Sequence, residues 1–296
     1  MNSKSIISHF LILSTFVVSN SAFSETFEQW KKDYAHRASQ RGISKSFVLK
    51  ILKDVQRDQK VVERDSNQVT LDKDRSYHQF MRKWQREDNE RAVQGLKLLK
   101  EHATLLQKIE DEYQVEKEII VSLWGVETFY GTITGDYNVV RSLATLSHDG
   151  RRRKFYETQL NATLRLIKNK HTTAKDFVGS WAGATGQCQF MPSNIPAYGQ
   201  DYNKDGKIDI WSTKADVFAS IANFLRQVGW RKGEKIGSFI SKSSRIKHKN
   251  IASIPLKDSP MILKGPNYRA IQRWNNSSLF VAFNMVLMNS FQKELK

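Results

Sequence analysis

The sequence predicts a mainly α-helical protein, and two observations carry this prediction. Apolar residues recur every three to four positions over most of residues 26–118, which is the period of an amphipathic helix. Residues 116–130 form a strongly apolar segment that we expect to be a central helix, buried on nearly all sides. Only the weakly periodic tail after residue 235 leaves room for strands.

The N-terminal region, residues 25–114, is expected to be helical. Ser44 is the expected N-cap of its second helix. The polar segment 54–74 holds few core residues, so we expect it to cross the surface as a connector. Helical patterning then returns at residues 77–84 and 90–113. The first helix is marked by Phe27, Trp30, Tyr34 and Ala38, and the last stretch by one stripe of Ala92, Leu96, Leu99, Ala103, Leu106 and Ile109.

The central region, residues 115–235, begins with the apolar helix. Gly131 is expected to terminate this helix, because glycine adopts the left-handed conformation at little steric cost. Pro192 and Pro196 keep the segment around them from forming one long helix. Three shorter helices are expected at residues 139–146, 152–169 and 213–228.

The C-terminal region, residues 236–296, is expected to be a small extension. Residues 236–264 are basic and rich in serine, which suits either a small strand-bearing insertion or a mobile loop. Residues 279–291 are expected to close the chain as a helix. The roughly 270 residues after residue 24 suffice for one large domain or for two smaller ones that share a cleft.

The N-terminus predicts export. A basic residue precedes an apolar run at residues 6–18, and Ala22 and Ser24 meet the small-residue rule for signal-peptide cleavage. We therefore expect residues 1–24 to be a signal peptide and the mature chain to be periplasmic. The alternative, a membrane anchor, needs about 18 or more apolar residues. Residues 19–24, directly after the run, contain no cysteine, so neither lipid attachment nor stable membrane insertion after cleavage is expected.

The charge balance predicts a polyanionic partner. The chain has 47 Lys and Arg against 30 Asp and Glu, a formal charge of +17. Nucleic acid is the usual candidate for such a balance, but an exported protein first meets acidic wall polymers and anionic lipid headgroups, so nucleic acid is not expected. The single cysteine, Cys188, cannot form an internal disulfide, so the core must stabilise the fold.

Glu127 is the strongest candidate for a catalytic residue. It is the only acid in the apolar run 119–131, and Trp124 and Phe129 lie close to it in the sequence. Apolar surroundings disfavour the charged form, which raises the pKa of a carboxyl group towards the range where it donates a proton near neutral pH. The alternative is a glutamate at a helix end that reaches solvent or pairs with Arg141 or another basic residue.

Residues 180–193 are a second candidate site. Their sequence, SWAGATGQCQFMPS, combines small residues, amides, aromatic rings and a proline in a segment too irregular for an amphipathic period. A lone acid beside such a loop suggests carbohydrate chemistry.

Several motifs follow one another in a fixed order through residues 115–235. They are GVETFYG at 125–131, SLATL at 142–146, GSWAGA at 179–184, QFMPS at 189–193 and SIANFL at 220–225, followed later by WNNS at 274–277. Together they resemble the lytic transglycosylases of the membrane-bound lytic transglycosylase B type, enzymes with a lysozyme-like core that cut peptidoglycan. The resemblance implies a lysozyme-like core at 115–235, completed by the N-terminal helical region and the small C-terminal extension.

The resemblance also implies a lyase reaction on a polysaccharide. Most glycosidases use two carboxylates, whereas enzymes of this family use one glutamate, which matches Glu127. It protonates the oxygen between N-acetylmuramic acid and N-acetylglucosamine, and the sugar's own acetamido group stabilises the resulting cation. The glutamate then removes the proton of the C6 hydroxyl, which closes a 1,6-anhydro ring without water. Neither the apolar helix nor residues 180–193 hold a second acid, although Asp149 could fold nearby.

The same resemblance implies a groove for glycan strands of peptidoglycan, the expected partner. The substrate-binding residues that it implies are Ser180, Gln189, Phe190, Phe80, Phe224, Trp274, Asn275 and Phe280. The family often has tyrosine at the positions of Phe80, Phe224, Trp274 and Phe280. On this resemblance, these residues keep the stacking of rings on sugars, but each lacks the phenolic hydroxyl that could donate a hydrogen bond. Plain core packing is the alternative for Phe80 and Phe224.

Residues 201–209 match the first nine positions of an EF-hand calcium loop. The oxygen ligands expected for a structural Ca²⁺ are those of Asp201, Asn203, Asp205, the backbone carbonyl of Lys207, and Asp216. The match fails at the twelfth position, Ser212, so either Asp216 closes the shell, as the family's longer loop suggests, or binding is weak. An unoccupied turn rich in Asp and Asn is the alternative. No organic cofactor is expected.

Two rival hypotheses belong to other classes. His148 and Asp149, followed by the arginines at 151–153, fit a His-Asp pair or a phosphate clamp, but neighbours on a loop seldom face each other. These arginines are more plausibly structural or contact acidic stem peptides. The second rival is a wall-binding or scaffolding protein that keeps the fold but has lost catalysis.

Overall fold

A computed structural model of the chain describes residues 25–67, 73–86, 89–242 and 250–294. These residues form thirteen helices and five short strands, which confirms the predicted mainly α class. The signal peptide predicted at residues 1–24 lies outside the described residues.

In the part of the chain that the structure describes, no helix combines the length and the apolar character needed to cross a membrane.

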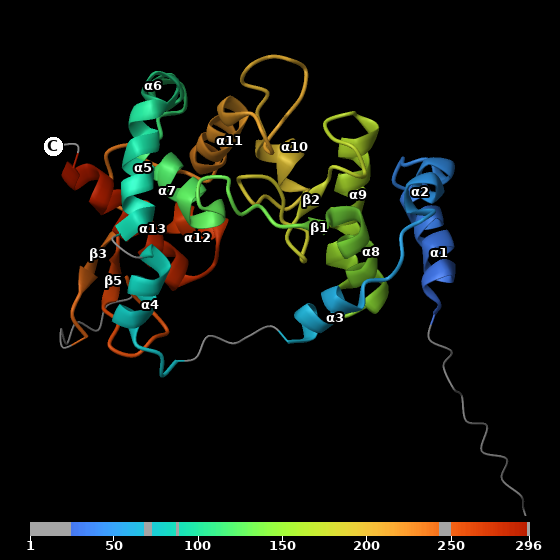
Figure 1. Ribbon diagram of the computed structural model, residues 1–296, viewed down its shortest axis with the longest axis horizontal. Coiled ribbons are helices and arrows are strands. Elements are labelled where there is room, and N and C mark those ends of the chain that lie inside the picture. Colours follow the sequence, from blue (N-terminus) through green and yellow to red (C-terminus); the bar gives the residue numbers. More distant parts are fainter. Residues whose placement is uncertain (1–24, 68–72, 87–88, 243–249, 295–296) are drawn as a thin grey trace, which may run out of the picture.

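The elements follow the chain as labelled in Figure 1. The helices are α1 (Phe27–Ser39), α2 (Lys45–Leu52), α3 (Gln59–Ser66), α4 (Tyr77–Gln85), α5 (Glu90–Glu101), α6 (Ala103–Tyr113), α7 (Lys117–Thr128), α8 (Val139–Asp149), α9 (Arg153–Lys168), α10 (Asn194–Tyr198), α11 (Lys214–Gln227), α12 (Tyr268–Trp274) and α13 (Ser278–Glu294). The strands are β1 (Tyr137–Asn138), β2 (Val178–Gly179), β3 (Gly237–Ile240), β4 (Ile251–Ser253) and β5 (Met261–Lys264).

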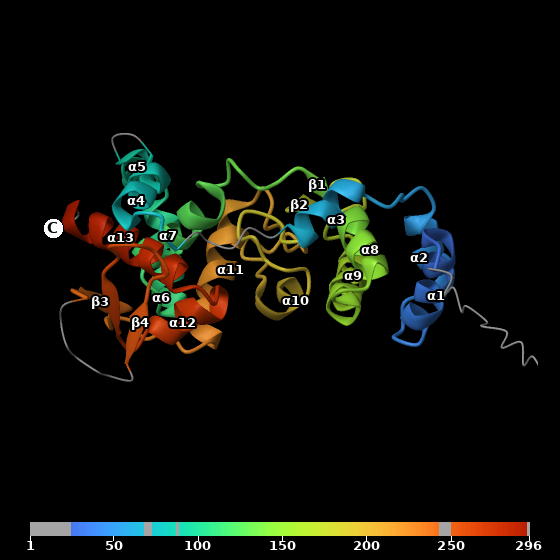
Figure 2. The ribbon, with the colours of Figure 1, turned by 90° about the horizontal axis from the view of Figure 1, so that it is seen from below.

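The molecule is elongated, and its helices form two groups (Figures 1 and 2). At one end, α1 and α2 pack on each other and lie next to the pair α8 and α9, with α3 against α8. Towards the other end, α7 packs against α5, α6, α11 and α13. The loops between β2 and α11 lie between the two groups.

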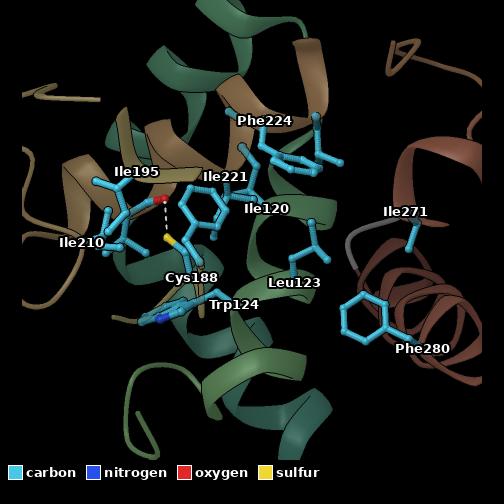
Figure 3. Close-up of a cluster of buried hydrophobic side chains, with 14 of the residues drawn as sticks. Ile120, Leu123, Trp124, Cys188, Ile195, Ile210, Ile221, Phe224, Ile271 and Phe280 are labelled. Carbon is cyan, nitrogen blue, oxygen red and sulfur yellow. Dashed lines mark hydrogen bonds between the residues drawn. The ribbon is translucent and has the colours of Figure 1, made fainter. Parts of the chain in front are cut away.

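Helix α7 is the centre of the second group. The seven consecutive residues 119–125 are all buried, which confirms the prediction of a central helix buried nearly all round. Its one hydroxyl in this stretch, Ser122, donates to the side-chain oxygen of Asn284 on α13 at 2.9 Å. Figure 3 shows Leu123 and Trp124 of α7 in the same core as Phe224 of α11. The helix is therefore held on several sides at once.

Gln187 joins three parts of this core through one buried amide. Its Oε1 accepts the indole N–H of Trp124 and the ammonium of Lys214, both at 2.9 Å. Its Nε2 donates to the backbone carbonyl of Trp211 at 2.7 Å, and its own carbonyl accepts the hydroxyl of Thr128. Because the Gln187 side chain is almost fully buried, the Trp124 indole N–H and the Trp211 carbonyl depend on it for their hydrogen bonds.

The structure corrects two predictions for the N-terminal region. Residues 54–74 were expected to be a surface connector, but they include α3, whose Val61 and Asp65 are buried. The stripe at 90–113 was expected to be continuous, yet α5 and α6 are separate helices joined at His102, and Ala103 is exposed. A single period cannot reveal a change of helix axis that leaves most apolar positions in phase.

Two helix ends also differ from the predictions. Helix α7 ends at Thr128, because Phe129 already has the left-handed backbone that was expected first at Gly131. Ser44 is the N-cap residue of α2 as predicted, but its hydroxyl bonds to that of Ser46 and caps no backbone N–H.

The C-terminal extension contains the small sheet that was one of its two predicted forms. Strands β3, β5 and β4 lie in that order and pair antiparallel. Residues 243–249 lie outside the described residues. Helix α12 was not predicted, since a seven-residue helix is too short to show a clear period.

The Gln187 network predicts a large effect of one substitution on stability. Gln187→Ala should lower the free energy of unfolding by about 3 kcal/mol, because it leaves the buried Trp124 N–H and the Trp211 carbonyl without partners. Urea unfolding followed by circular dichroism measures this. Gln29→Ala is the control, since Gln29 makes an exposed bond to Asp33, and its effect should stay within ~0.5 kcal/mol. Equal effects of the two variants would contradict the role of Gln187.

Candidate active site

Glu127 lies in the last turn of α7, and its side chain is partly buried. The helix ends one residue later, and Phe129 and Tyr130 both have left-handed backbones, with φ of 48° and 62°. Non-glycine residues in this region cost conformational energy and cluster at functional sites. This double left-handed turn takes the chain away from the helix axis, so no further helical turn covers Glu127.

Arg91 of α5 holds this helix end. Its guanidinium donates hydrogen bonds to the backbone carbonyls of Gly125 and Trp84. It also lies 4.9 Å from the centre of the Phe129 ring, and its own carbonyl accepts the Tyr130 hydroxyl at 2.6 Å. Burial lowers the pKa of Arg91, while a cation against the last carbonyls of a helix is favourable. Sequence reasoning missed Arg91, because one arginine on an amphipathic helix gives no signal.

The environment of Glu127 makes its carboxyl group a weak acid. Burial raises the pKa of Glu127 from an ordinary value of 4.5 to about 7, because apolar surroundings disfavour the charged form. The indole N–H of Trp274 donates to Glu127 Oε1 at 2.6 Å and opposes part of this rise. The negative end of the α7 dipole acts in the same direction as burial. Near neutral pH such a group can both donate and accept a proton.

Four aromatic rings in mutual contact, which we call the aromatic wall, reach this carboxyl group through Trp274: Phe190, Tyr198, Phe224 and Trp274. The Trp274 ring centre is 5.2 Å from that of Phe190 and 4.7 Å from that of Phe224. Tyr198 lies 4.6 Å from Phe224. Because Trp274 also bonds to Glu127, the wall and the acid form one continuous site. Tyr198 was not among the predicted residues, and no motif marked it.

The loop at residues 180–193 consists of tight turns held by their own hydrogen bonds. The backbone N–H of Ser180 donates to the Ala184 carbonyl at 2.7 Å, and Ser180 Oγ accepts the Ala184 N–H at 3.0 Å. Gln189 has a left-handed backbone, and its Nε2 donates to two backbone carbonyls, one of them that of Thr134. Among the described residues, none donates to Gln189 Oε1. This oxygen is therefore free to accept a bond from a ligand.

The remaining predicted substrate residues lie in two places. Phe80 of α4 stacks on Phe283 of α13 at 6.0 Å, apart from the aromatic wall. Phe280 is buried on α13, and Figure 3 shows it on the far side of this core from Cys188. Asn275 follows directly after α12 and is exposed. The structure thus brings Phe190, Phe224 and Trp274 to the acid, while Phe80 and Phe280 make no ring contact with the wall within the described residues.

The charged alternatives for Glu127 are engaged elsewhere. Arg141 lies 3.4 Å from Asp58, and Asp149 pairs with Arg57 at the same distance. Within the described part of the chain, Glu127 has no ion pair, and no second carboxylate contributes to its raised pKa. The site therefore contains one acid in an apolar setting.

The other rival groups are structural. A ring nitrogen of His148 lies 2.7 Å from the Glu25 carbonyl, and the ring packs edge-on against Phe27. The Arg151 guanidinium bonds to the buried Asp65 through Nε at 2.7 Å. Cys188 is buried as a free thiol, and burial, followed by the nearby Glu127 and Asp216 charges, raises its pKa well above the ordinary value. These groups hold the fold together.

The EF-hand-like loop is shaped around its acidic side chains. Asp201 accepts the backbone N–H groups of Asp205 and Gly206 at 3.0 and 2.8 Å, and Gly206 has φ of +88°. Asp216 is fully buried and accepts two further backbone N–H groups of the loop, both at 2.8 Å. No group of three or more His, Cys, Asp or Glu side chains among the described residues is arranged to hold a metal ion. The loop is preorganised, with backbone donors on its carboxylates.

The fold and the site together define a class of protein. A mainly helical molecule that places one glutamate at the end of a buried helix, next to aromatic rings and a small-residue loop, is an enzyme of the lysozyme-like type. The chain belongs to the transglycosylase SLT domain family, whose model matches residues 26–259. This is a family of lytic murein transglycosylases.

Known proteins agree with this assignment. The chain is 37% identical over 125 residues to membrane-bound lytic murein transglycosylase B of Escherichia coli strain K12; the alignment covers 42% of the chain and only 34% of that relative. SltB3 from Pseudomonas aeruginosa, solved in complex with NAG-NAM-pentapeptide, superposes with a TM-score of 0.81 at 31% identity, covering 90% of this chain and 80% of that one. The same protein was also solved with NAG-anhNAM-pentapeptide.

A more distant structure shows the same fold. The lytic transglycosylase Slt35 of Escherichia coli, solved in complex with calcium, has a TM-score of 0.78 at 23% identity and covers 90% of this chain and 93% of that one. The lysozyme-like fold expected from the motifs is therefore confirmed.

The Trp274 hydrogen bond predicts a change in the acidity of Glu127. Trp274→Phe removes a donor that favours the ionised carboxyl group, so the pKa of Glu127 should rise above its wild-type value of about 7. NMR titration of carboxyl carbons in protein labelled at glutamate measures the pKa. Trp211→Phe is the matched control, because the Trp211 indole bonds to Thr185 instead of Glu127. A pKa that stays the same or falls in Trp274→Phe would contradict this role.

Proposed function

We propose that the chain is a lytic transglycosylase that cleaves the β-1,4 bond between N-acetylmuramic acid and N-acetylglucosamine in peptidoglycan. The reaction is non-hydrolytic and gives 1,6-anhydro-N-acetylmuramic acid ends. The observation that carries this proposal is the single carboxyl group of Glu127, with a pKa of about 7, in an apolar site next to an aromatic wall. The peptidoglycan fragments bound by SltB3 support the substrate class.

In the first step, protonated Glu127 donates its proton to the bridging oxygen as the bond to the muramic acid C1 breaks. The N-acetylglucosamine part leaves as an alcohol, and the acetamido oxygen of the muramic acid stabilises the cation at C1. In the second step, the Glu127 carboxylate removes the proton of the C6 hydroxyl while O6 bonds to C1. The anhydro ring closes, and Glu127 returns to its protonated form, so no water is consumed.

The surroundings of Glu127 suit this use of one carboxyl group. A hydrolase of the inverting or retaining type places a second carboxylate within about 5–10 Å of the acid, and no such group contributes to the pKa of Glu127 among the described residues. In this proposal the aromatic wall, which contacts the acid through Trp274, limits the access of water to the cation. In this proposal Gln189 Oε1 and the Ser180 hydroxyl bind polar groups of the glycan.

The proposed place of action is the periplasm. The apolar run at residues 6–18, followed by small residues, supports export. The net charge of +17 then favours contact with the acidic wall.

The rival proposal is a wall-binding protein without catalytic activity. Both proposals use the aromatic wall and the basic surface to bind glycan, so binding alone does not separate them. They differ in whether the proton of Glu127 is needed.

Glu127→Gln separates the two. The amide retains the size of the side chain and can still accept the Trp274 N–H, but it has no acidic proton to donate. We expect release of soluble fragments from purified sacculi to fall at least about 1,000-fold, while binding to sacculi stays near wild type. Release is measured by chromatography of the soluble products, and binding by co-sedimentation. The catalytic proposal is wrong if the variant releases fragments at the wild-type rate, or if the wild type releases none.

The pH dependence of stability tests whether Glu127→Gln is correctly folded. The pKa of Glu127 is higher in the folded state, about 7, than its ordinary value of 4.5. The protonated Glu127 side chain therefore contributes its full share to the free energy of unfolding below pH 4.5. This contribution is lost as the pH rises through 7, and its loss lowers the free energy of unfolding by about 3 kcal/mol. Glu127→Gln should therefore match the wild type at pH 4 and exceed it in stability at pH 8. An inactive variant that is less stable at pH 8 would point to a damaged fold.

We also propose that the loop 201–216 binds Ca²⁺ weakly. Asp216 is buried without a cationic partner among the described residues, which is costly for a carboxylate and favours a bound cation. The oxygens of Asp201, Asn203 and Asp205 and the carbonyl of Lys207 would complete the set, all hard ligands suited to calcium. The ion would rigidify the loop and takes no part in the chemistry.

Calcium should therefore raise the melting temperature of the protein relative to a chelator. Asp205→Ala should abolish this difference, because it removes one oxygen ligand. Lys204→Gly should keep or increase it, because it removes a nearby positive charge at a residue with φ of +60°. Differential scanning fluorimetry in calcium and in chelator measures all three. Identical wild-type melting curves in the two conditions would rule out the site.

A further inference from the structure

A pocket of about 780 Å³ lies outside the Glu127 site. It is formed where the end of α2, the residues after α9 and the loop at 205–211 meet. None of the residues of the aromatic wall lines it. In Figures 1 and 2, α2 and α9 lie towards the opposite end of the molecule from α12 and α13. The pocket is thus a separate feature of the surface.

The pocket has an apolar floor with a partly exposed aromatic ring. Ile51, Ile167 and Trp211 line it. The Trp211 indole N–H donates to Thr185 Oγ1 at 2.8 Å, and its carbonyl accepts from Gln187, so the ring is held in place from behind. A fixed ring suits small apolar groups such as the methyl groups of alanine.

Polar groups of both signs line the same pocket. Lys170 and Lys207 have no ion pair with any described residue. Asp205 and Asp209 also line the pocket, but their carboxylates accept hydrogen bonds from within their own loop. His171 accepts the backbone N–H of Ile208 at its Nδ1, at 3.1 Å, so its Nε2 carries the proton and is a donor. Asp176 accepts the Thr173 hydroxyl through Oδ2, which leaves its Oδ1 without a partner in the described part of the chain. Such a lining is complementary to a zwitterion.

Lys170 lies at the end of α9 and lines the pocket. Lys170 has φ of +62° just after the end of α9, a position that favours glycine. This left-handed backbone closes the end of α9, because the N–H of Lys170 donates to the Ile167 carbonyl at 3.0 Å and that of His171 to the Leu166 carbonyl at 3.1 Å. The Lys170 ammonium makes no bond to a described residue. The capped helix end fixes the position from which the Lys170 side chain leaves the backbone at the pocket.

We propose that this pocket binds the peptide stem of peptidoglycan, as a second contact remote from the bond that is cut. A stem is a short peptide with free carboxylates, small alanine side chains and an amine. Lys170, Lys207 and His171 would bind carboxylate, Trp211 would contact methyl groups, and Asp176 would bind the amine. This inference rests on the proposed function for the identity of the ligand. The pocket would let the enzyme bind glycan strands that carry peptide stems at a second point.

The test is NMR titration of the full-length protein with the free stem pentapeptide ending in D-Ala-D-Ala. The indole N–H resonance of Trp211 should shift on addition, while that of Trp274 at the Glu127 site should not. Lys170→Glu should weaken binding about tenfold, the effect of losing one charge-assisted hydrogen bond and reversing its charge. Lys175→Glu is the matched control, because Lys175 is an exposed residue of the same loop that does not line the pocket. The affinity of this variant for the peptide should equal that of the wild type.

A second variant, Lys170→Gly, tests whether a loss of affinity comes from a damaged fold. Glycine relieves the left-handed strain, so this variant should melt at or above the wild-type temperature and still lose peptide affinity. The inference is overturned if the peptide fails to shift Trp211 at millimolar concentration, if Trp274 shifts instead, or if Lys170→Gly binds like the wild type. Glu127→Gln should bind the peptide normally. Failure of the proposed function would appear separately, as absence of anhydro products from the wild type.

Discussion

The structure depends on keeping one carboxyl group in apolar surroundings at the end of a buried helix. Helix α7 supplies the apolar surroundings, and its abrupt end leaves the Glu127 side chain at an open helix terminus. Arg91 fixes that terminus from outside by bonding to the Gly125 carbonyl, and Trp274 fixes the carboxyl group itself. The positive charge of Arg91 thus stabilises the helix end, but it does not contribute to the pKa of Glu127. If the cation contacted Glu127 directly, its pKa would fall and the acid would lose its proton at neutral pH.

The same constraint explains the polar groups inside this core. A central helix with the buried hydroxyl of Ser122 and the indole N–H of Trp124 needs buried partners, and Asn284 and Gln187 provide them. The small-residue loop carries Gln187 into the core while it brings Phe190 to the aromatic wall. The core and the site are therefore built from the same loop, so substitutions in residues 180–193 are expected to affect stability and activity together.

The sequence predicted the main features of this arrangement because they rest on local pattern. A lone acid in an apolar run identified Glu127, and the small-residue segment identified the loop beside it. The features that it did not predict depend on tertiary contacts. Helix α12 is too short to show a period, yet it places Trp274 against Glu127. Arg91 and Tyr198 look like ordinary helix residues, and their roles follow only from the packing of α5 on α7 and of α10 on α11. The early end of α7 needed the left-handed backbone of Phe129, which residue type alone does not favour.

The central claim is that one desolvated acid gives and takes back a proton while water stays away from the cation. Digestion of purified sacculi in water labelled with heavy oxygen, followed by mass spectrometry of the fragments, tests it most directly. The account predicts muramic acid ends that lack the elements of water and carry no label. Labelled reducing ends formed by the wild-type protein would contradict it, because they would show that water reaches the cation before O6 closes the ring.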